Sequence, residues 1–309
     1  MRFVSLLPRL LATLVIVGIA AALGWYLWDY YMREPWTRDG RVRADVVRVA
    51  PDVSGIVGAI HVVDNQWVAA GDPLFTIDRD RFRIAVEQAE ASARSRRAEM
   101  EQAQRDSDRL AHLNDMASSV QAREQAASTA EMAAAAYQRA LADLDLANLN
   151  LERTEVRASV DGYVNNLTLR VGDYVDAGEA VLPLIDAHSF YVAGYFEETK
   201  LPRIAPGAPV RIALMGVGPE LWGHVDSVAT GIVDRERGRG DNLLPDVNPT
   251  FNWVRLAQRL PVRIAIDCVP DGVRLAGGLT ATVRVLAAER ADEPLPAGCS
   301  PPDRHAAPD

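Results

Sequence analysis

The side chains that most often carry chemistry are few in this chain and lie far apart. It has 309 residues, with five histidines and two cysteines, Cys268 and Cys299. The histidines show no metal-ligand spacing, the cysteines form no CxxC pair, and no GxSxG, P-loop or strand-following GxGxxG motif occurs. The histidines are His61, His112, His188, His224 and His305. The sequence therefore predicts no catalytic, metal or cofactor-binding residue, and a protein that is not an enzyme.

The charge balance argues against one class of partner. The formal net charge is −9, and 49% of the residues are hydrophobic. A nucleic-acid-binding protein is expected to show a basic face or domain, which this composition does not indicate. The hydrophobic content in a chain of this length is sufficient for sizeable buried cores.

Two stretches of the chain, 53–78 and 160–186, repeat one pattern. They read VSGIVGAIHVVDNQWVAAGDPLFTID and VDGYVNNLTLRVGDYVDAGEAVLPLID. Each copy consists of short strands of alternating polarity separated by turn residues. The glycines that align in the two copies, and that we assign to turns, are Gly55, Gly71, Gly162 and Gly178. Because a two-stranded piece is marginal in water, we expect the copies to pack together as one β domain.

A β domain built from such a repeat resembles a lipoyl or biotinyl carrier, whose prosthetic group hangs on a turn lysine. This chain has a single lysine, Lys200, which lies outside both copies. The turn after Ile77 reads Asp78-Arg79, and an arginine cannot form the required amide. The sequence therefore excludes the carrier role and predicts no cofactor.

Residues 80–153, between the copies, predict an antiparallel helical hairpin. Its first part lacks Gly and Pro and is rich in Ala, Glu, Gln and Arg, which are strong helix formers. After a break at 114–117, Ser118 with Gln121 three residues on predicts the start of the second helix. Apolar residues at alternating spacings of three and four predict a coiled-coil seam. We assign to the seam Phe82, Val86, Ala89, Ala93, Met100, Ala103 and Leu110, then Ala127, Ala130, Ala134, Tyr137, Leu141, Leu144, Asn148 and Leu151.

The N-terminal segment, residues 1–34, predicts a membrane anchor. Nineteen residues from Leu10 to Trp28 carry no charge, which is about the length that crosses a bilayer core as a helix. Arg2 and Arg9 precede this run, so the positive-inside rule places the N-terminus in the cytoplasm. The alternative is a cleaved signal peptide, but the apolar run continues into an aromatic cluster that a signal peptide does not need.

Residues 189–290 predict a small antiparallel β-barrel. Apolar-alternating segments such as SFYVAGYF and LTATVRVLA are separated by Pro and Gly. The rest, 291–309, is rich in Pro and predicts a disordered tail. Cys299 lies in this tail, so the sequence leaves open whether it forms a disulfide with Cys268 or both remain thiols.

The predicted fold class is mainly β with an α-helical coiled-coil hairpin. The expected order is an N-terminal transmembrane helix, a split lipoyl-like (barrel-sandwich hybrid) domain and an antiparallel β-barrel. The split lipoyl-like domain has two halves, 35–79, which includes a lead-in strand, and 154–188. The hairpin separates these halves.

With this plan, the chain resembles the HlyD family of periplasmic adaptors, also called membrane fusion proteins. The segment LERTEVRASVDGYV, residues 151–164, is similar to the family pattern LxxTxIxAPxDGxV, with Ser159 in place of the usual Pro. Family adaptors that dock on a TolC-like outer-membrane channel carry Arg, Leu and Ser at the hairpin tip. The resemblance assigns these roles to Arg109, Leu113 and Ser119, although Ser119 lies one residue closer to the arginine than in the family pattern.

Within the family, PWTRDGRVRADVVRVAPDVSG and NWVRLAQRLPVRI are similar to the adaptors of aromatic carboxylic acid (p-hydroxybenzoate) efflux pumps. That resemblance implies a single-pass inner-membrane protein with most of the chain in the periplasm. It also implies an inner-membrane exporter of the fusaric-acid-resistance type and a homo-oligomeric ring, commonly a hexamer. The alternative is an adaptor for polypeptide (type I) secretion or another multidrug export system, although type I adaptors usually have longer coiled coils.

Overall fold

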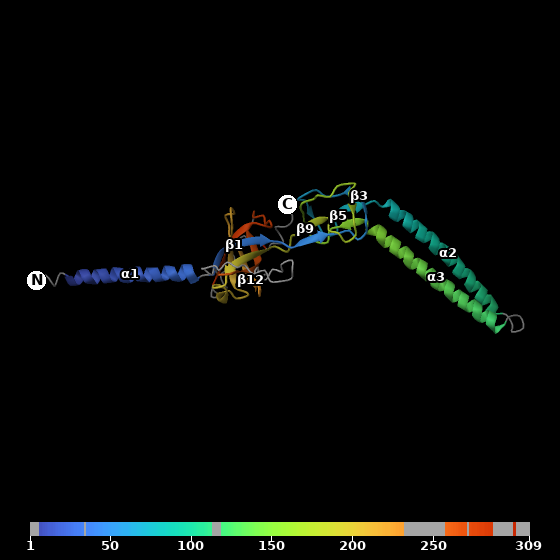
Figure 1. Cartoon of the computed structure of the whole chain (residues 1–309), viewed down its shortest axis with the longest axis horizontal. Helices are drawn as coiled ribbons and strands as arrows, with labels where there is room; N and C mark the ends of the chain where they lie inside the picture. The colour runs from blue at the N-terminus through green and yellow to red at the C-terminus, as the bar shows by residue number, and fades with distance from the viewer. Residues whose placement is uncertain are drawn as a thin grey trace, which may run out of the picture. The chain divides into compact units, whose positions relative to one another are not determined.

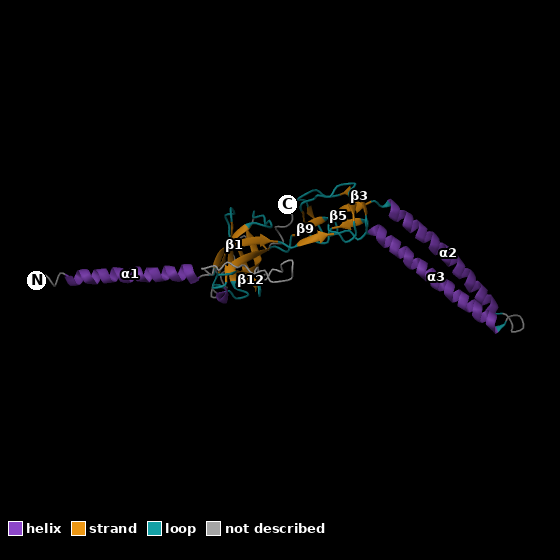
Figure 2. Cartoon of the chain, in the orientation of Figure 1, coloured by secondary structure: helices purple, strands orange, loops and turns teal. Residues whose placement is uncertain are grey.

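The structure, a computed structural model, describes residues 6–33, 35–112, 119–231, 257–270, 272–286 and 299–300. The chain forms two compact units, one of which is inserted into the sequence of the other (Figure 1). One unit comprises Val46–Asp186, and the other combines Met1–Asp45 with Ala187–Asp309. Strands build both β domains, and long helices form the N-terminal segment and the hairpin (Figure 2).

The segment predicted as an anchor is helical, and α1 extends over Leu6–Arg33. The structure describes its side chains over 13–26, where all are exposed. Over the part of the chain that the structure describes, no helix combines the length and the apolar composition needed to cross a membrane.

The two sequence copies form a pair of four-stranded antiparallel sheets, in the orders β2-β9-β7-β4 and β6-β5-β3-β8. The first copy and the strand before it supply β2 (Val46–Val49), β3 (Gly55–Ile60), β4 (Trp67–Val68) and β5 (Pro73–Ile77). The second copy and the strand before it supply β6 (Glu155–Arg157), β7 (Gly162–Val164), β8 (Tyr174–Val175) and β9 (Leu182–Asp186). Each sheet takes two strands from each copy. Replacing every strand by its counterpart in the other copy converts one order into the other; the counterparts are β2 and β6, β3 and β7, β4 and β8, and β5 and β9. The expectation that the copies complete one another is confirmed.

The apolar residues of both copies share one core. Leu74, Phe75 and Ile77 of β5 have no exposed surface, nor do Val164 and Leu184 of the second copy. Burying such side chains contributes about 1.5–3 kcal/mol each relative to leaving them exposed. This shared core explains how strands of only two to six residues form a stable unit.

The second unit is a closed antiparallel barrel, as predicted. Its sheet runs β10-β1-β14-β11-β12-β13, and a further pairing of β10 with β13 closes it. The strands are β1 (Trp36–Arg43), β10 (Tyr191–Glu197), β11 (Pro209–Leu214), β12 (Leu221–Val228), β13 (Arg259–Pro270) and β14 (Thr280–Val285), with a short 3-10 helix, η1, at Leu201–Arg203. Its core includes Val42, Phe196, Ile212, Leu221, Ile264 and Val283, all fully buried.

Two boundary predictions need correction. The lead-in strand expected within 35–79 is β1, and it pairs with β10 and β14 of the barrel. The tail at 291–309 lies largely outside the described residues, but Cys299–Ser300 form strand β15 against the end of β13. Cys268 on β13 is disulfide-bonded, and Cys299 is the only other cysteine of the chain. Backbone pairing therefore replaces the expected disorder at these two residues.

The hairpin consists of α2 (Asp80–Ala111) and α3 (Val120–Glu152), which lie side by side and antiparallel (Figure 1). The seam predicted on the first helix is confirmed, with Ala93 buried and the other six apolar residues half-buried. The seam predicted on the second helix is partly wrong. Ala127 and Asn148 are exposed, whereas the half-buried positions are Ala126 and Ala147.

The observed α3 seam follows 126, 130, 133, 137, 140, 144, 147 and 151. Five of these eight positions are alanines, and four of the five, Ala126, Ala133, Ala140 and Ala147, occupy every second place of the seam. Small residues at a helix contact allow the two axes to approach closely. The larger Leu141 therefore lies beside the seam, where it is half-buried.

This seam can be tested at adjacent alanines. We predict that Ala140→Leu destabilises the protein by about 1–3 kcal/mol, because the added atoms overpack a contact in which Ala140 is 5% exposed. Urea unfolding of the full chain, followed by circular dichroism at a helical wavelength, measures the loss. Ala142→Leu, on an exposed position of the same helix, is the control and should stay within about 0.5 kcal/mol of the parent. Equal losses from the two substitutions would contradict the assigned seam.

Candidate functional site

The hairpin is inserted between two neighbouring strands, β5 and β6, of one sheet. These strands pair antiparallel, with Phe75 opposite Val156 and Thr76 opposite Glu155. The Ile77 amide donates a hydrogen bond of 2.8 Å to the Thr154 carbonyl. This bond extends the pairing to the point where α2 begins and α3 ends. The two ends of the hairpin are thus held together by the sheet itself.

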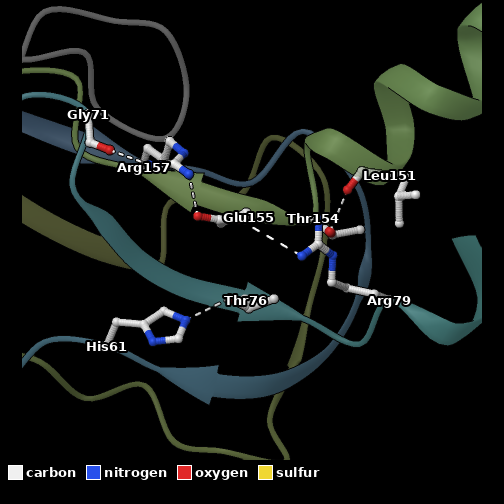
Figure 3. Close-up of polar contacts among 8 residues, drawn as sticks. All are labelled: His61, Gly71, Thr76, Arg79, Leu151, Thr154, Glu155 and Arg157. Carbon is white, nitrogen blue, oxygen red and sulfur yellow. Dashed lines mark hydrogen bonds and ion pairs between the residues drawn. The ribbon is translucent and has the colours of Figure 1, made fainter. Parts of the chain in front are cut away.

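Thr154 is the buried centre of this root, which we define as Arg79, Thr154, Glu155 and Arg157 (Figure 3). Thr154 has no exposed surface. Its hydroxyl donates to the Leu151 carbonyl at 2.6 Å and so satisfies a carbonyl in the last turn of α3. Thr154 therefore connects the last turn of α3, through its hydroxyl, with strand β5, through its carbonyl.

The charged residues of the root converge on Glu155 (Figure 3). Its carboxylate lies 2.5 Å from the Arg157 guanidinium and 4.0 Å from that of Arg79, the N-cap of α2. Arg157 also donates to the Gly71 carbonyl at 2.7 Å. One carboxylate thus connects the residues at the start of the hairpin with those at its end.

Arg79 stands in the turn where a lipoyl-type carrier would hold its lysine. Its conformation is helical, at φ −88° and ψ −13°, and it leads directly into α2. The lysine of this chain, Lys200, lies in the barrel unit, where its ammonium is 3.3 Å from the Trp36 carbonyl. The turn therefore connects a strand to an arm and offers no amine for a cofactor.

The four repeat glycines fall into two kinds. Gly71 and Gly178 have φ of 94° and 80°, a conformation that favours glycine in turns, as predicted. Gly55 and Gly162 are the first, buried residues of β3 and β7, so the assignment of these two to turns is wrong. At Gly55 a Cβ would lie 2.6 Å from a methyl group of Ile77, so close packing against β5 requires glycine there.

Two of the three predicted tip residues, Arg109 and Ser119, lie at the end of the hairpin farthest from β5 and β6. Arg109 is near the end of α2, with its side chain 71% exposed and 3.3 Å from Asp106. Ser119 is the N-cap of α3, and its hydroxyl accepts from the Ala122 amide at 3.1 Å. The cap is therefore one residue later than the predicted Ser118, which, like Leu113, lies outside the described residues.

Several arginines of α2 form ion pairs with carboxylates on the surface of the same helix. Glu101 accepts a 2.9 Å hydrogen bond from Arg97 and raises the pKa of that guanidinium. Among the residues that the structure describes, no three His, Cys, Asp or Glu side chains gather into a group that could hold a metal ion. The geometry of the hairpin is that of an arm with an exposed charged tip and a fixed root.

The root was not predicted from the sequence. The signal was present in LERTEVRASVDGYV, since Thr154, Glu155 and Arg157 all fall within it. Asp161 of the same segment accepts from the Ala70 amide at 2.7 Å and links the two copies. The resemblance of this segment to a family pattern does not give the contact that each of its polar residues makes.

The root has a direct test in Thr154→Val, which keeps the shape of the side chain and removes its hydroxyl. We predict a loss of about 1 kcal/mol in unfolding free energy, because the Leu151 carbonyl loses its shorter hydrogen bond and keeps the longer one from the Thr154 amide at 3.3 Å. Thr129→Val is the matched control: its hydroxyl donates to the Gln125 carbonyl at 2.8 Å on the exposed face of α3. Urea unfolding of both variants measures the difference, and an equal or smaller loss for Thr154→Val would contradict this role.

Comparison with known proteins agrees with this architecture. Residues 45–186 match the barrel-sandwich hybrid domain of RND membrane fusion proteins, and 189–286 match the AAEA-like β-barrel domain. The uncharacterised protein YdhJ of Escherichia coli K12 is 43% identical over 274 residues, which cover 89% of this chain and 96% of YdhJ.

Solved structures share the fold at lower identity. The membrane fusion protein Spr0693 of Streptococcus pneumoniae R6 superposes with a TM-score of 0.60 at 16% identity, covering 81% of this chain and 97% of its own. A MacA–MexA chimera with the α-hairpin domain of Pseudomonas aeruginosa MexA gives 0.57 at 21% identity, covering 82% of this chain and 81% of its own. The interleaved β domains, the inserted hairpin and the relatedness to YdhJ lead to one assignment: the chain belongs to the HlyD/RND family of membrane fusion proteins.

Proposed function

We propose that this chain is the periplasmic adaptor subunit of an efflux pump, which links an inner-membrane exporter to an outer-membrane channel. The observation that carries the proposal is the lipoyl-like unit whose carrier turn, Asp78-Arg79, opens into a helical hairpin. Membrane fusion proteins are non-enzymatic adaptors that act with inner-membrane transporters and outer-membrane channels in oligomeric assemblies.

The hairpin has the dimensions and surface of a connecting arm. Helices of 32 and 33 residues extend roughly 48 Å at 1.5 Å per residue. The exposed Arg109 guanidinium at the far end is the group that we propose meets the channel, together with Leu113 and Ser119. Ser119 supports this contact through its cap of α3, which fixes where the second helix begins.

We also propose that residues 10–28 anchor the adaptor in the inner membrane, with the N-terminus in the cytoplasm and the bulk of the chain in the periplasm. The support is the uncharged run of nineteen residues with Arg2 and Arg9 before it. Membrane fusion proteins of this family are membrane-anchored periplasmic adaptors.

For the exported compounds we propose aromatic carboxylic acids, with an exporter of the fusaric-acid-resistance type and a ring of six adaptors. The support is the similarity of several segments, among them PWTRDGRVRADVVRVAPDVSG, to adaptors of p-hydroxybenzoate efflux pumps. The match of 189–286 to the AAEA-like barrel is consistent with the same group.

The channel contact predicts a position-specific effect of charge reversal. Arg109→Asp should abolish tolerance of p-hydroxybenzoate in cells that depend on this pump, because an interface arginine that is reversed costs about 2 kcal/mol or more. Growth at increasing concentrations of the acid measures tolerance, and immunoblotting confirms equal abundance.

Arg94→Asp is the matched control for this measurement. Arg94 lies in the middle of α2, has a side chain 74% exposed, and pairs with Glu90 at 3.7 Å, much as Arg109 pairs with Asp106. Cells with Arg94→Asp should keep full tolerance. Full tolerance with Arg109→Asp, and with Leu113→Asp as a second variant, would refute the docking role of the tip.

The partners can be identified by affinity purification of the full chain from native membranes after mild cross-linking. We expect a fusaric-acid-resistance-type permease and an outer-membrane channel to co-purify. Recovery of an ATP-binding exporter in place of the permease would instead support the polypeptide-secretion alternative.

A further inference from the structure

The barrel contains a place where two paired strands separate. β10 pairs with β1 from Tyr191 opposite Arg43 to Gly194 opposite Gly40, and no further. β10 then continues to Glu197 against β13. The register of β1 against β14 also shifts between Thr37 and Gly40. Arg38 and Asp39 thus form a bulge, an irregularity that often redirects side chains beside functional sites.

Thr37 bridges the separated strands. Its side chain is only 9% exposed, and its hydroxyl donates to the Tyr195 carbonyl at 2.8 Å while accepting from the Asp39 amide at 3.1 Å. A side chain thus replaces the missing backbone pairing and holds the gap at a fixed width. The opening is therefore a built feature of the barrel.

A cleft of about 240 Å³ occupies this opening. It is lined by Thr37 together with Trp36, Arg38, Tyr195, Glu197, Lys200 and Arg259. Pockets for drug-sized ligands enclose about 300–1,000 Å³, so this cleft suits a smaller molecule of about one ring.

The charges in the cleft leave one cation in excess. Lys200 lies 3.8 Å from Glu197, and Arg259 lies 3.1 Å from Asp39. Arg38 stacks over the Trp36 ring at 5.3 Å, and none of the described residues forms an ion pair with it. A ligand with a single negative charge would neutralise this excess positive charge.

The rest of the lining is aromatic. Trp36 is half-buried, and the Tyr195 hydroxyl accepts a 2.9 Å hydrogen bond from Arg43 that fixes the phenol. Planar rings and a guanidinium together suit a flat anion, because a carboxylate can take two parallel hydrogen bonds from an arginine. An anionic lipid headgroup would use the guanidinium of Arg38 but would gain nothing from the rings of Trp36 and Tyr195.

We propose that this cleft binds a small aromatic carboxylate, with Arg38 pairing with the carboxylate and Trp36 and Tyr195 contacting the ring. The choice of ligand rests on the proposed function in aromatic acid export. Trp36 follows the last residue of α1, Arg33, by three residues, so the cleft is within about 10 Å of chain from the end of that helix. Cargo leaving an exporter at the membrane would meet this end of the barrel first.

The test is isothermal titration of the detergent-purified full chain with 4-hydroxybenzoate. We expect saturable binding, at least about tenfold weaker for Arg38→Gln, since a hydrogen-bonded charge pair is lost. Arg41→Gln is the matched control, since Arg41 is exposed on the same strand and does not line this cleft. It should bind as the parent does. The uncharged 4-hydroxybenzyl alcohol should bind at least about tenfold more weakly than the acid.

Three results would overturn the inference: no binding at millimolar acid, equal binding by Arg38→Gln and the parent, or equal competition by phosphate or phosphatidylglycerol vesicles. The last would identify a general anion or lipid site. Co-purification of the permease with the same variants separates the two proposals. If the permease is retained but the acid does not bind, the cleft assignment fails and the adaptor role stands.

Discussion

The pairing of β5 with β6 is the contact on which the rest of the molecule depends, because it closes the hairpin at its root. β5 comes from the first sequence copy and β6 leads into the second, so their sheet is complete only after the chain has run out and back through 80–153. The entropy cost of closing a loop grows only with the logarithm of its length. The long insertion is therefore compatible with the fold, and the contact between α2 and α3 orders the loop further.

The barrel likewise depends on pairing between strands that are far apart in the sequence. β1 precedes the lipoyl-like unit in sequence, yet it lies between β10 and β14, which follow that unit. The chain thus leaves the barrel after Asp45 and returns at Ala187, and the Asp45 amide donates to the Ser189 hydroxyl at 2.7 Å where the two crossings meet. The barrel is therefore assembled from two separate stretches of chain, and it is completed only after the whole lipoyl-like unit has been traversed.

How far the sequence predicted this arrangement depends on the range of the interaction. The alignment of Gly55 with Gly162 predicted the shared β domain, because the repeat appears directly in the residues. The lead-in strand was expected within 35–79, but its residues carry no information on their partner strands, so β1 was assigned to the wrong unit. A spacing of three and four fits two phases on α3, and only contact with α2 decides that Ala140 and not Leu141 enters the seam. The root and the cleft require a three-dimensional register, which local patterns do not contain.

The positive cleft in the barrel also has to be reconciled with an acidic chain. At a net charge of −9, the field of the whole protein repels an anion, but salt screens exposed charges beyond about 8 Å at physiological ionic strength. Inside the cleft the decisive charges are those in direct contact, and there Glu197 and Asp39 are already engaged by Lys200 and Arg259. With the long-range repulsion screened, binding depends on the exposed guanidinium of Arg38, and an ion pair exposed to solvent favours a weak, readily reversible complex. Under the proposed role in acid export, such a complex suits a passage, because a tightly held ligand would block it.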